Sequence, residues 1–267
     1  MSKETETKVV EMATEAAPKT IEQLKVRESE LDQINDDLIK EMQTREYEID
    51  FKTKIIEAQI DGMLLKINEH EFWTRLIGNF NAYNITAVYA IAILLGQDQL
   101  QVLTTLSTMH SVRGRFEYLK AKNGTLGIVD YAHTPDALQN VLETIADVNS
   151  AKVQVITVVG CGGDRDRTKR PEMARIAADM SNRVLLTSDN PRSEDPAMIR
   201  AAVLQGCPEA VDAGAREDAI AKAMDALGPG DVLAVAGKGH ESGQEIAGIV
   251  HAFDDVAMVR KLVGALP

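Results

Sequence analysis

Hydrophobic and polar residues follow three different patterns along the chain. Near the N-terminus, Leu24, Leu31, Ile34, Leu38 and Met42 are spaced by three, four or seven residues. This spacing predicts an amphipathic helix over residues 20–47. The first 18 residues are polar and predict a disordered tail. An apolar helix face of this kind usually packs against another protein surface. We therefore expect the helix to contact a protein partner or the body of the chain.

The pattern changes at residue 51. Apolar residues alternate with polar ones around Ile55–Leu65 and break at Gly62, which predicts short strands joined by a turn. Helical periodicity follows over 84–95 and 97–109. The segment 78–84 is rich in Gly and Asn, and we expect it to be a hinge.

From residue 113 onward, short apolar runs alternate with helical segments. Asn123-Gly124 predicts a hairpin between 116–121 and 125–130. Further strands are expected at 153–159, 183–187 and 232–236, with a weaker one at 209–212. Helices are expected between or after them, at 135–148, 171–181, 196–205, 215–227 and 254–264; Pro135, Pro171 and Pro196 lie near three of their starts. This alternation predicts the α/β class, with a Rossmann-like, doubly wound, mostly parallel sheet.

The composition and charge of the chain exclude several classes of protein. The 267 residues carry a net charge of −12, which argues against binding to nucleic acid or to an anionic membrane surface. About half of this excess of negative charge lies in residues 1–50, which hold 14 Asp/Glu and 7 Lys/Arg. The two cysteines, Cys161 and Cys207, form no CxxC pair, which suits a reducing compartment. No apolar run is long enough for a signal peptide or a membrane span, so we expect a soluble cytoplasmic protein.

Four polar clusters follow predicted strands, at 129–136, 160–167, 188–192 and 237–241. Ligands of open parallel sheets bind beyond the carboxyl ends of the strands. The four clusters should therefore meet at one edge of the sheet. Because they carry both signs of charge, they predict a site for a zwitterionic or phosphorylated small molecule.

Each cluster also has a purely structural interpretation. Thr134 is a good helix N-cap, and His133 could be a hydrogen-bonded surface histidine. The segment 160–163 departs from GxGxxG, and the arginines that follow it suit carboxylate capture better than a dinucleotide. Asn190-Pro191 is a common turn. Gly237-Lys238-Gly239 looks like half of a P-loop, although the chain contains no Gly-Lys-Ser/Thr sequence.

Six motifs in a fixed order carry a family resemblance. They read Gly-x-Phe-Asn-x-x-Asn (78–84), Gly-Arg-Phe-Glu (114–117), Asp-Tyr-Ala-His-Thr-Pro-Asp (130–136), Gly-Cys-Gly-Gly-Asp-Arg-Asp (160–166), Asp-Asn-Pro-Arg (189–192) and Gly-Lys-Gly-His-Glu (237–241). Over 51–267 the chain resembles the C-terminal half of Mur ligases. The match is to the branch that adds meso-diaminopimelate to UDP-MurNAc-L-Ala-D-Glu in peptidoglycan synthesis.

The resemblance implies two groups of site residues. The meso-diaminopimelate site would comprise Arg165, Asp189, Asn190, Pro191, Arg192, Gly237 and Glu241. The arginines would bind carboxylates, and the acidic and carbonyl groups would accept from an ammonium group. The nucleotide cleft would comprise Asn81, Asn84, Arg115, Asp130 and His133. No metal ligands are predicted.

The resemblance also implies partners and domain limits. Family members use ATP and Mg²⁺ to activate the D-Glu carboxylate, with a phosphate-binding loop that this sequence does not contain. We therefore expect a polar tail and helix (1–50), a remnant of the central domain (51–112) and a C-terminal amino-acid-binding domain (113–267). The chain would be a truncated or fused ligase that does not bind ATP or catalyse alone. The alternatives are a non-catalytic diaminopimelate-binding or assembly module and an unrelated nucleotide-binding α/β domain.

Overall fold

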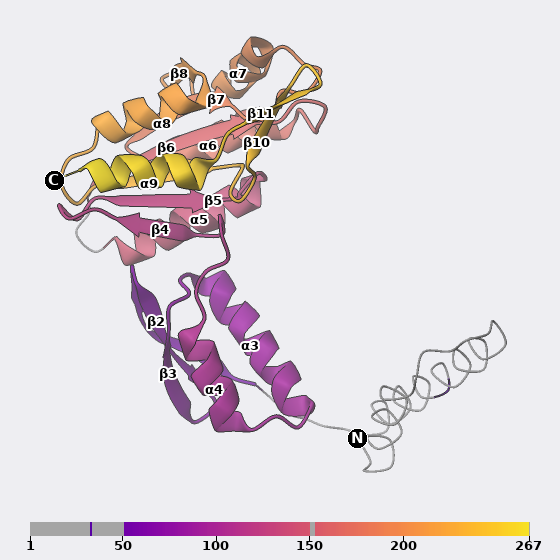
Figure 1. The fold of residues 1–267 in the computed structure, drawn as a ribbon, viewed down its shortest axis with the longest axis vertical. Coiled ribbons are helices and arrows are strands. Elements are labelled where there is room, and N and C mark those ends of the chain that lie inside the picture. Colours follow the sequence, from indigo (N-terminus) through magenta and orange to yellow (C-terminus); the bar gives the residue numbers. More distant parts are fainter. Residues whose placement is uncertain (1–32, 34–50, 150–152, 267) are drawn as a thin grey trace.

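The computed structural model describes residue 33 and residues 51–149 and 153–266. The disordered tail and the helix predicted at 20–47 lie outside the described residues, apart from Gln33. Two units follow one another along the described chain (Figure 1). Within these residues, no helix is long and apolar enough to cross a membrane.

The smaller unit is an antiparallel sheet covered by two helices. Its strands β1 (Thr53–Gln59), β2 (Gly62–Ile67) and β3 (His70–Thr74) pair in sequence order. Helices α3 (Asn79–Leu94) and α4 (Gln99–Thr108) pack on this sheet through a core that includes Met63, Leu65, Ile85 and Tyr89. The predicted alternation around Gly62 is confirmed as a hairpin, and β3 was not predicted.

The hinge predicted at 78–84 is instead the start of α3. Only Gly78, with φ of 94°, lies outside the helix, and the Asn81 side chain donates a hydrogen bond to the Ile77 carbonyl at 2.8 Å. Ala82, Ile85 and Tyr89 are buried at helical spacing. The prediction was wrong because three asparagines resemble a turn, whereas the buried residues among and after them follow a helical period.

The larger unit contains a six-stranded sheet in the order β4-β5-β9-β6-β7-β8. The strand β4 (Glu117–Lys120) pairs antiparallel with β5 (Leu126–Asp130) across the predicted hairpin. The other neighbours pair in parallel. These strands are β6 (Val155–Cys161), β7 (Arg183–Ser188), β8 (Val211–Gly214) and β9 (Val232–Ala236). The predicted doubly wound α/β class is confirmed.

Helices cover both faces of this sheet (Figure 1). One buried core joins the sheet to α5 (Pro135–Val148), α6 (Lys169–Met180) and α7 (Pro196–Leu204). A second core on the other face joins it to α8 (Arg216–Asp225) and α9 (Asp255–Ala265). The central strands are therefore buried on both faces, which explains their nearly continuous apolar sequences.

A short hairpin, β10 (Gly243–Ile246) and β11 (Ile249–Ala252), lies outside the main sheet. Ala247 and Gly248 form its turn, with φ of 51° and 78°. Ile246 forms a bridge with Arg192, which anchors the hairpin beside the loop after β7. This hairpin was not predicted, because its strands are half polar and its turn lacks the usual Asn-Gly or Asp-Gly signal.

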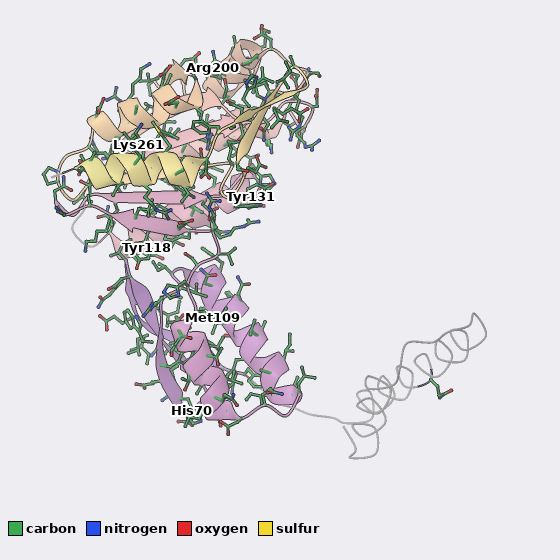
Figure 2. All side chains as sticks on the ribbon, in the orientation of Figure 1. His70, Met109, Tyr118, Tyr131, Arg200 and Lys261 are labelled. Atoms are coloured by element: carbon green, nitrogen blue, oxygen red, sulfur yellow. The ribbon has the colours of Figure 1, made fainter. Side chains whose placement is uncertain are left out.

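The two units meet below the β4–β5 edge of the larger sheet (Figure 1). Phe80 at the start of α3 packs against Phe116, with ring centroids 6.3 Å apart. Figure 2 shows Tyr118 on the side of the larger unit that faces the smaller one. The contact joins the first turn of α3 to the loop that carries the Gly-Arg-Phe-Glu motif.

Candidate functional site

The four polar clusters of the sequence meet at the carboxyl ends of β5, β6, β7 and β9. A cavity of about 390 Å³ opens at this edge. Its lining includes six of the predicted amino-acid-site residues: Arg165, Asp189, Asn190, Arg192, Gly237 and Glu241. His133, which was predicted for the nucleotide cleft, lines this cavity as well. Pro191 does not line it; its carbonyl accepts a hydrogen bond from the Glu194 amide at 3.0 Å.

Asp189 is a buried carboxylate at the floor of the cavity. Its Oδ1 accepts a hydrogen bond from the Asn190 amide at 2.6 Å. Its Oδ2 lies over Gly237, so that a Cβ atom at position 237 would lie only 2.6 Å away. Burial raises the pKa of Asp189, and the nearby charges of Arg216 and Lys238 oppose this rise. The glycine therefore makes room for an acid that two cations help to keep ionised.

Asn190, Lys238 and Glu241 form one hydrogen-bonded group beside Asp189. The Lys238 ammonium, fully buried, donates to Asn190 Oδ1 at 3.1 Å, to Glu241 Oε2 at 3.0 Å and to the Gly243 carbonyl at 2.6 Å. Asn190 Nδ2 donates to Glu241 Oε2 at 2.8 Å. Burial acts to raise the pKa of Glu241, but the hydrogen bonds from Lys238 and Asn190 outweigh it and lower that pKa. Glu241 therefore presents a negative charge to the cavity.

Arg192 supplies positive charge to the cavity lining. Its backbone is left-handed, with φ of 54°, and its amide donates to the Glu245 carbonyl of β10 at 3.0 Å. Nη1 of its guanidinium donates to the Gly163 carbonyl at 2.8 Å. Arg165 is exposed, and its one hydrogen bond within the described residues goes to the neighbouring Asp164 carbonyl, at 3.1 Å. Both guanidinium groups therefore have donors that can reach a carboxylate in the cavity.

A further set of charged residues connects the loop after β6 to the loop after β7 through hydrogen bonds. Glu194 accepts from the Asp164 amide at 2.7 Å and from Arg170 Nη2 at 2.8 Å. The hydrogen bond from Arg170 lowers the pKa of Glu194 most strongly. Asp164 in turn accepts from the Ser193 hydroxyl at 2.7 Å. These contacts fix the loop that carries Arg165 relative to Arg192.

Cys161 also lines the cavity, but its chemistry is that of a core residue. The side chain is buried and packs against Met173, with the two sulfur atoms 3.7 Å apart. Burial raises the pKa of its thiol to about 11. The group is therefore neutral near pH 7 and is not an activated nucleophile.

A second cavity of about 420 Å³ lies between α3 and α5, at the junction of the two units. Asn81, Asn84, Arg115 and Asp130 line it together, as predicted for the second group of residues. Asp130 accepts from the Phe116 amide at 2.6 Å, and burial raises the pKa of its carboxyl. The Arg115 guanidinium lies 4.5 Å from the centroid of the Tyr131 ring, which separates this cavity from the first.

The second cavity has donors and acceptors that suit the uncharged part of a nucleotide. Three asparagine side chains, those of Asn81, Asn84 and Asn140, can bond to a base or a sugar hydroxyl. A magnesium site does not fit the described residues, which contain no group of three or more His, Cys, Asp or Glu side chains that could hold a metal ion.

Sequence reasoning missed Lys238 as a site residue. Its neighbours Gly237 and Gly239 suggested half of a phosphate-binding loop, in which a lysine would point at a ligand. Instead, the ammonium is buried behind Asn190 and Glu241. The sequence feature that could have indicated this is Glu241. It lies three residues after Lys238 and can form an ion pair with it.

Comparisons with known proteins agree with the motifs. Residues 114–239 match the family model described as Mur ligase, glutamate ligase domain. The chain is 47% identical over 222 residues to the UDP-N-acetylmuramoyl-L-alanyl-D-glutamate--2,6-diaminopimelate ligase of Cytophaga hutchinsonii, covering 81% of this chain and 46% of that protein. The chain thus spans less than half the length of this curated relative.

Solved structures of Mur ligases and related enzymes are similar to this chain as well. A structure of a UDP-N-acetylmuramoyl-L-alanyl-D-glutamate--2,6-diaminopimelate ligase is 37% identical, with a TM-score of 0.59, covering 82% of this chain and 46% of that chain. A folylpolyglutamate synthase of Mycobacterium tuberculosis, complexed with ADP and AMPPCP, is 18% identical, with a TM-score of 0.56 and coverage of 80% and 48%. The second likeness shows the fold alone.

Proposed function

Because residues 114–239 match the family model described as Mur ligase, glutamate ligase domain, we propose that the cavity at the carboxyl ends of the strands binds meso-diaminopimelate. The observation that carries this proposal is that carboxylates and guanidinium groups line the same cavity. Asp189 and Glu241 line it together with Arg192 and Arg165. An amino acid with an ammonium group next to a carboxylate presents the complementary pair of charges.

Each residue has a distinct role in this proposal. Asp189, Glu241 and the Gly237 carbonyl accept hydrogen bonds from an ammonium group of the ligand. Arg192 and Arg165 bind the adjacent carboxylate through their forked donors. Lysine has only one carboxylate. With its α-ammonium group directed to the reaction, it would present its ε-ammonium group here and leave the Arg192 donors without a ligand carboxylate. The site would therefore prefer meso-diaminopimelate over lysine.

Arg192→Ala tests the proposed carboxylate contact. The substitution removes a charged donor, so the affinity for meso-diaminopimelate should fall roughly 10- to 100-fold. Arg183→Ala is the matched control, because Arg183 is an exposed arginine at the start of β7, whereas Arg192 lies in the loop after the end of that strand. Isothermal titration calorimetry of both variants measures the effect. Equal affinities of the two folded variants, or no binding to the unmodified chain, would contradict the proposal.

We also propose a role for this chain in a complete ligation reaction. The chain would serve as the amino-acid-binding part of an ATP-dependent ligase that joins meso-diaminopimelate to UDP-MurNAc-L-Ala-D-Glu. The second cavity would hold the nucleoside of ATP beside Arg115. The bound amine would attack an acyl phosphate formed on the D-Glu carboxylate, releasing phosphate. A Gly-Lys-Ser/Thr loop for the phosphates is absent from the sequence, so another polypeptide segment must supply it.

That absence favours a second candidate function, a meso-diaminopimelate-binding module without catalysis of its own. Phosphate release with ATP, Mg²⁺, meso-diaminopimelate and the UDP-MurNAc dipeptide distinguishes the two. We expect no release above background from this chain alone. Turnover by the purified chain would show that it is a complete ligase and would contradict this expectation.

A further inference from the structure

A buried guanidinium lies beneath the floor of the cavity. Arg216, at the start of α8, is only 1% exposed. Its Nε and Nη2 donate to the two oxygens of Asp255 on α9, each at 2.7 Å. Nη2 also donates to the Ala236 carbonyl at the end of β9, at 2.9 Å. These contacts hold the plane of the guanidinium rigidly against the sheet edge.

One nitrogen of this guanidinium is not used by these contacts. Nη1 of Arg216 is buried and, among the described residues, makes no hydrogen bond. The acidic oxygen that it faces is Oδ2 of Asp189, 4.0 Å away. A buried charged donor without a partner is energetically costly, so its presence needs a reason. The geometry provides one, because Nη1 points at the same oxygen that Gly237 exposes to the cavity.

The charges around Asp189 do not balance. Three carboxylates gather here, those of Asp189, Glu241 and Asp255, together with the two cations Arg216 and Lys238. Asp255 is paired with Arg216, and Glu241 is paired with Lys238. Asp189 accepts a hydrogen bond from the Asn190 amide, but its one ion pair among the described residues is the 4.0 Å contact with Arg216. Cys161, which faces Asp189 from β6, is a neutral thiol and adds no charge.

We propose that Arg216 is a positioning residue for Asp189, keeping its carboxylate ionised and turned toward the cavity, so that a ligand ammonium group supplies the missing positive charge. This inference rests on the proposed function, because meso-diaminopimelate is the ligand whose ammonium would occupy the site. Arg216 itself touches no ligand, since the floor of the cavity covers it.

The direction of the effect follows from the electrostatics. Burial raises the pKa of Asp189, and Arg216 is the strongest opposing charge. Without Arg216, this pKa should rise further. Because a protonated Asp189 offers the ammonium no negative charge, binding should weaken as the pH falls through that pKa. Loss of Arg216 should therefore move the decline in affinity to higher pH.

The test uses variants that separate this role from folding. Arg216→Met alone would leave Asp255 buried without its partner, so the matched change is Arg216→Met with Asp255→Leu, which replaces the buried pair by apolar groups. Arg216→Lys is the conservative variant and should retain most of the effect. In the ligand-free chain, ¹³C NMR follows the titration of the Asp189 carboxyl, identified by its loss in Asp189→Asn.

We expect the double variant to raise the midpoint of the Asp189 titration, because Arg216 lowers this pKa more strongly than Asp255 raises it. Its affinity for meso-diaminopimelate should decline at a higher pH than that of the unmodified chain and recover as the pH is raised further. An unchanged Asp189 midpoint in the folded double variant would overturn the inference, whatever the affinity.

The two proposals fail in different ways. If the unmodified chain does not bind meso-diaminopimelate but the Asp189 midpoint shifts as expected, the proposed function is wrong and the role of Arg216 stands. If meso-diaminopimelate binds but both the midpoint and the pH profile are unchanged in the double variant, the proposed function stands and the role of Arg216 is wrong.

Discussion

Gly237 shows how a single residue can determine the shape of the cavity. Its φ of 119° is unfavourable for residues with a side chain, and a Cβ atom here would overlap Asp189 Oδ2. The motif Gly-Lys-Gly-His-Glu made Gly237 a candidate, but its carbonyl was the expected contribution. In the structure, the absence of a side chain matters as much, because it leaves space for the buried carboxylate.

Gly237→Ala should therefore abolish the site while leaving most of the fold intact. The strained backbone and the overlap should lower the free energy of unfolding by about 1–3 kcal/mol. The displaced Asp189 should weaken meso-diaminopimelate binding by at least about tenfold, because a charged hydrogen bond contributes about 1.5–3 kcal/mol. Urea denaturation and calorimetry measure the two effects.

Gly264→Ala provides the control for this prediction. Gly264 lies inside α9, and a Cβ atom there would have no neighbour within 4 Å. Alanine should stabilise the helix by about 0.5–1 kcal/mol and leave binding unchanged. If Gly237→Ala bound meso-diaminopimelate as well as Gly264→Ala does, the proposed contact between Asp189 and the ligand would be contradicted.

At the scale of secondary-structure elements, the sequence was most informative where burial was complete. The strands β6, β7 and β9 are buried on both faces, and their apolar runs identified them directly. The bounds of α5 were predicted correctly, because Thr134 and Pro135 mark its start and its buried residues recur at helical spacing. In these segments, local preference and tertiary packing agree.

Prediction failed where tertiary contacts, not local sequence, define an element. The strand β10 is half polar, and its conformation depends on the bridge to Arg192 and on the donation from Gln244 to the Asp189 carbonyl, at 2.5 Å. Neither partner can be identified from the spacing of residues 243–246. The same limit applies to Arg216, whose partner Asp255 lies 39 residues further along the chain.

At the scale of the whole molecule, the two cavities are separated by the Tyr131 and Arg115 pair. The first cavity lies within the larger unit, and the second lies at the junction with the smaller unit. This arrangement supports the proposal that an amino acid and a nucleotide approach a common reaction centre from two sides. The motifs predicted the members of each group apart from His133, which lines the first cavity, and Pro191, which lines neither.

The central claim is that this cavity selects an amino acid by its second carboxylate. The most direct measurement is a calorimetric comparison of meso-diaminopimelate and L-lysine binding to the unmodified chain under the same conditions. Because lysine held by its ε-ammonium group offers Arg192 no carboxylate, its affinity should be at least about tenfold lower. Equal affinities for the two amino acids, or binding of lysine alone, would contradict the claim.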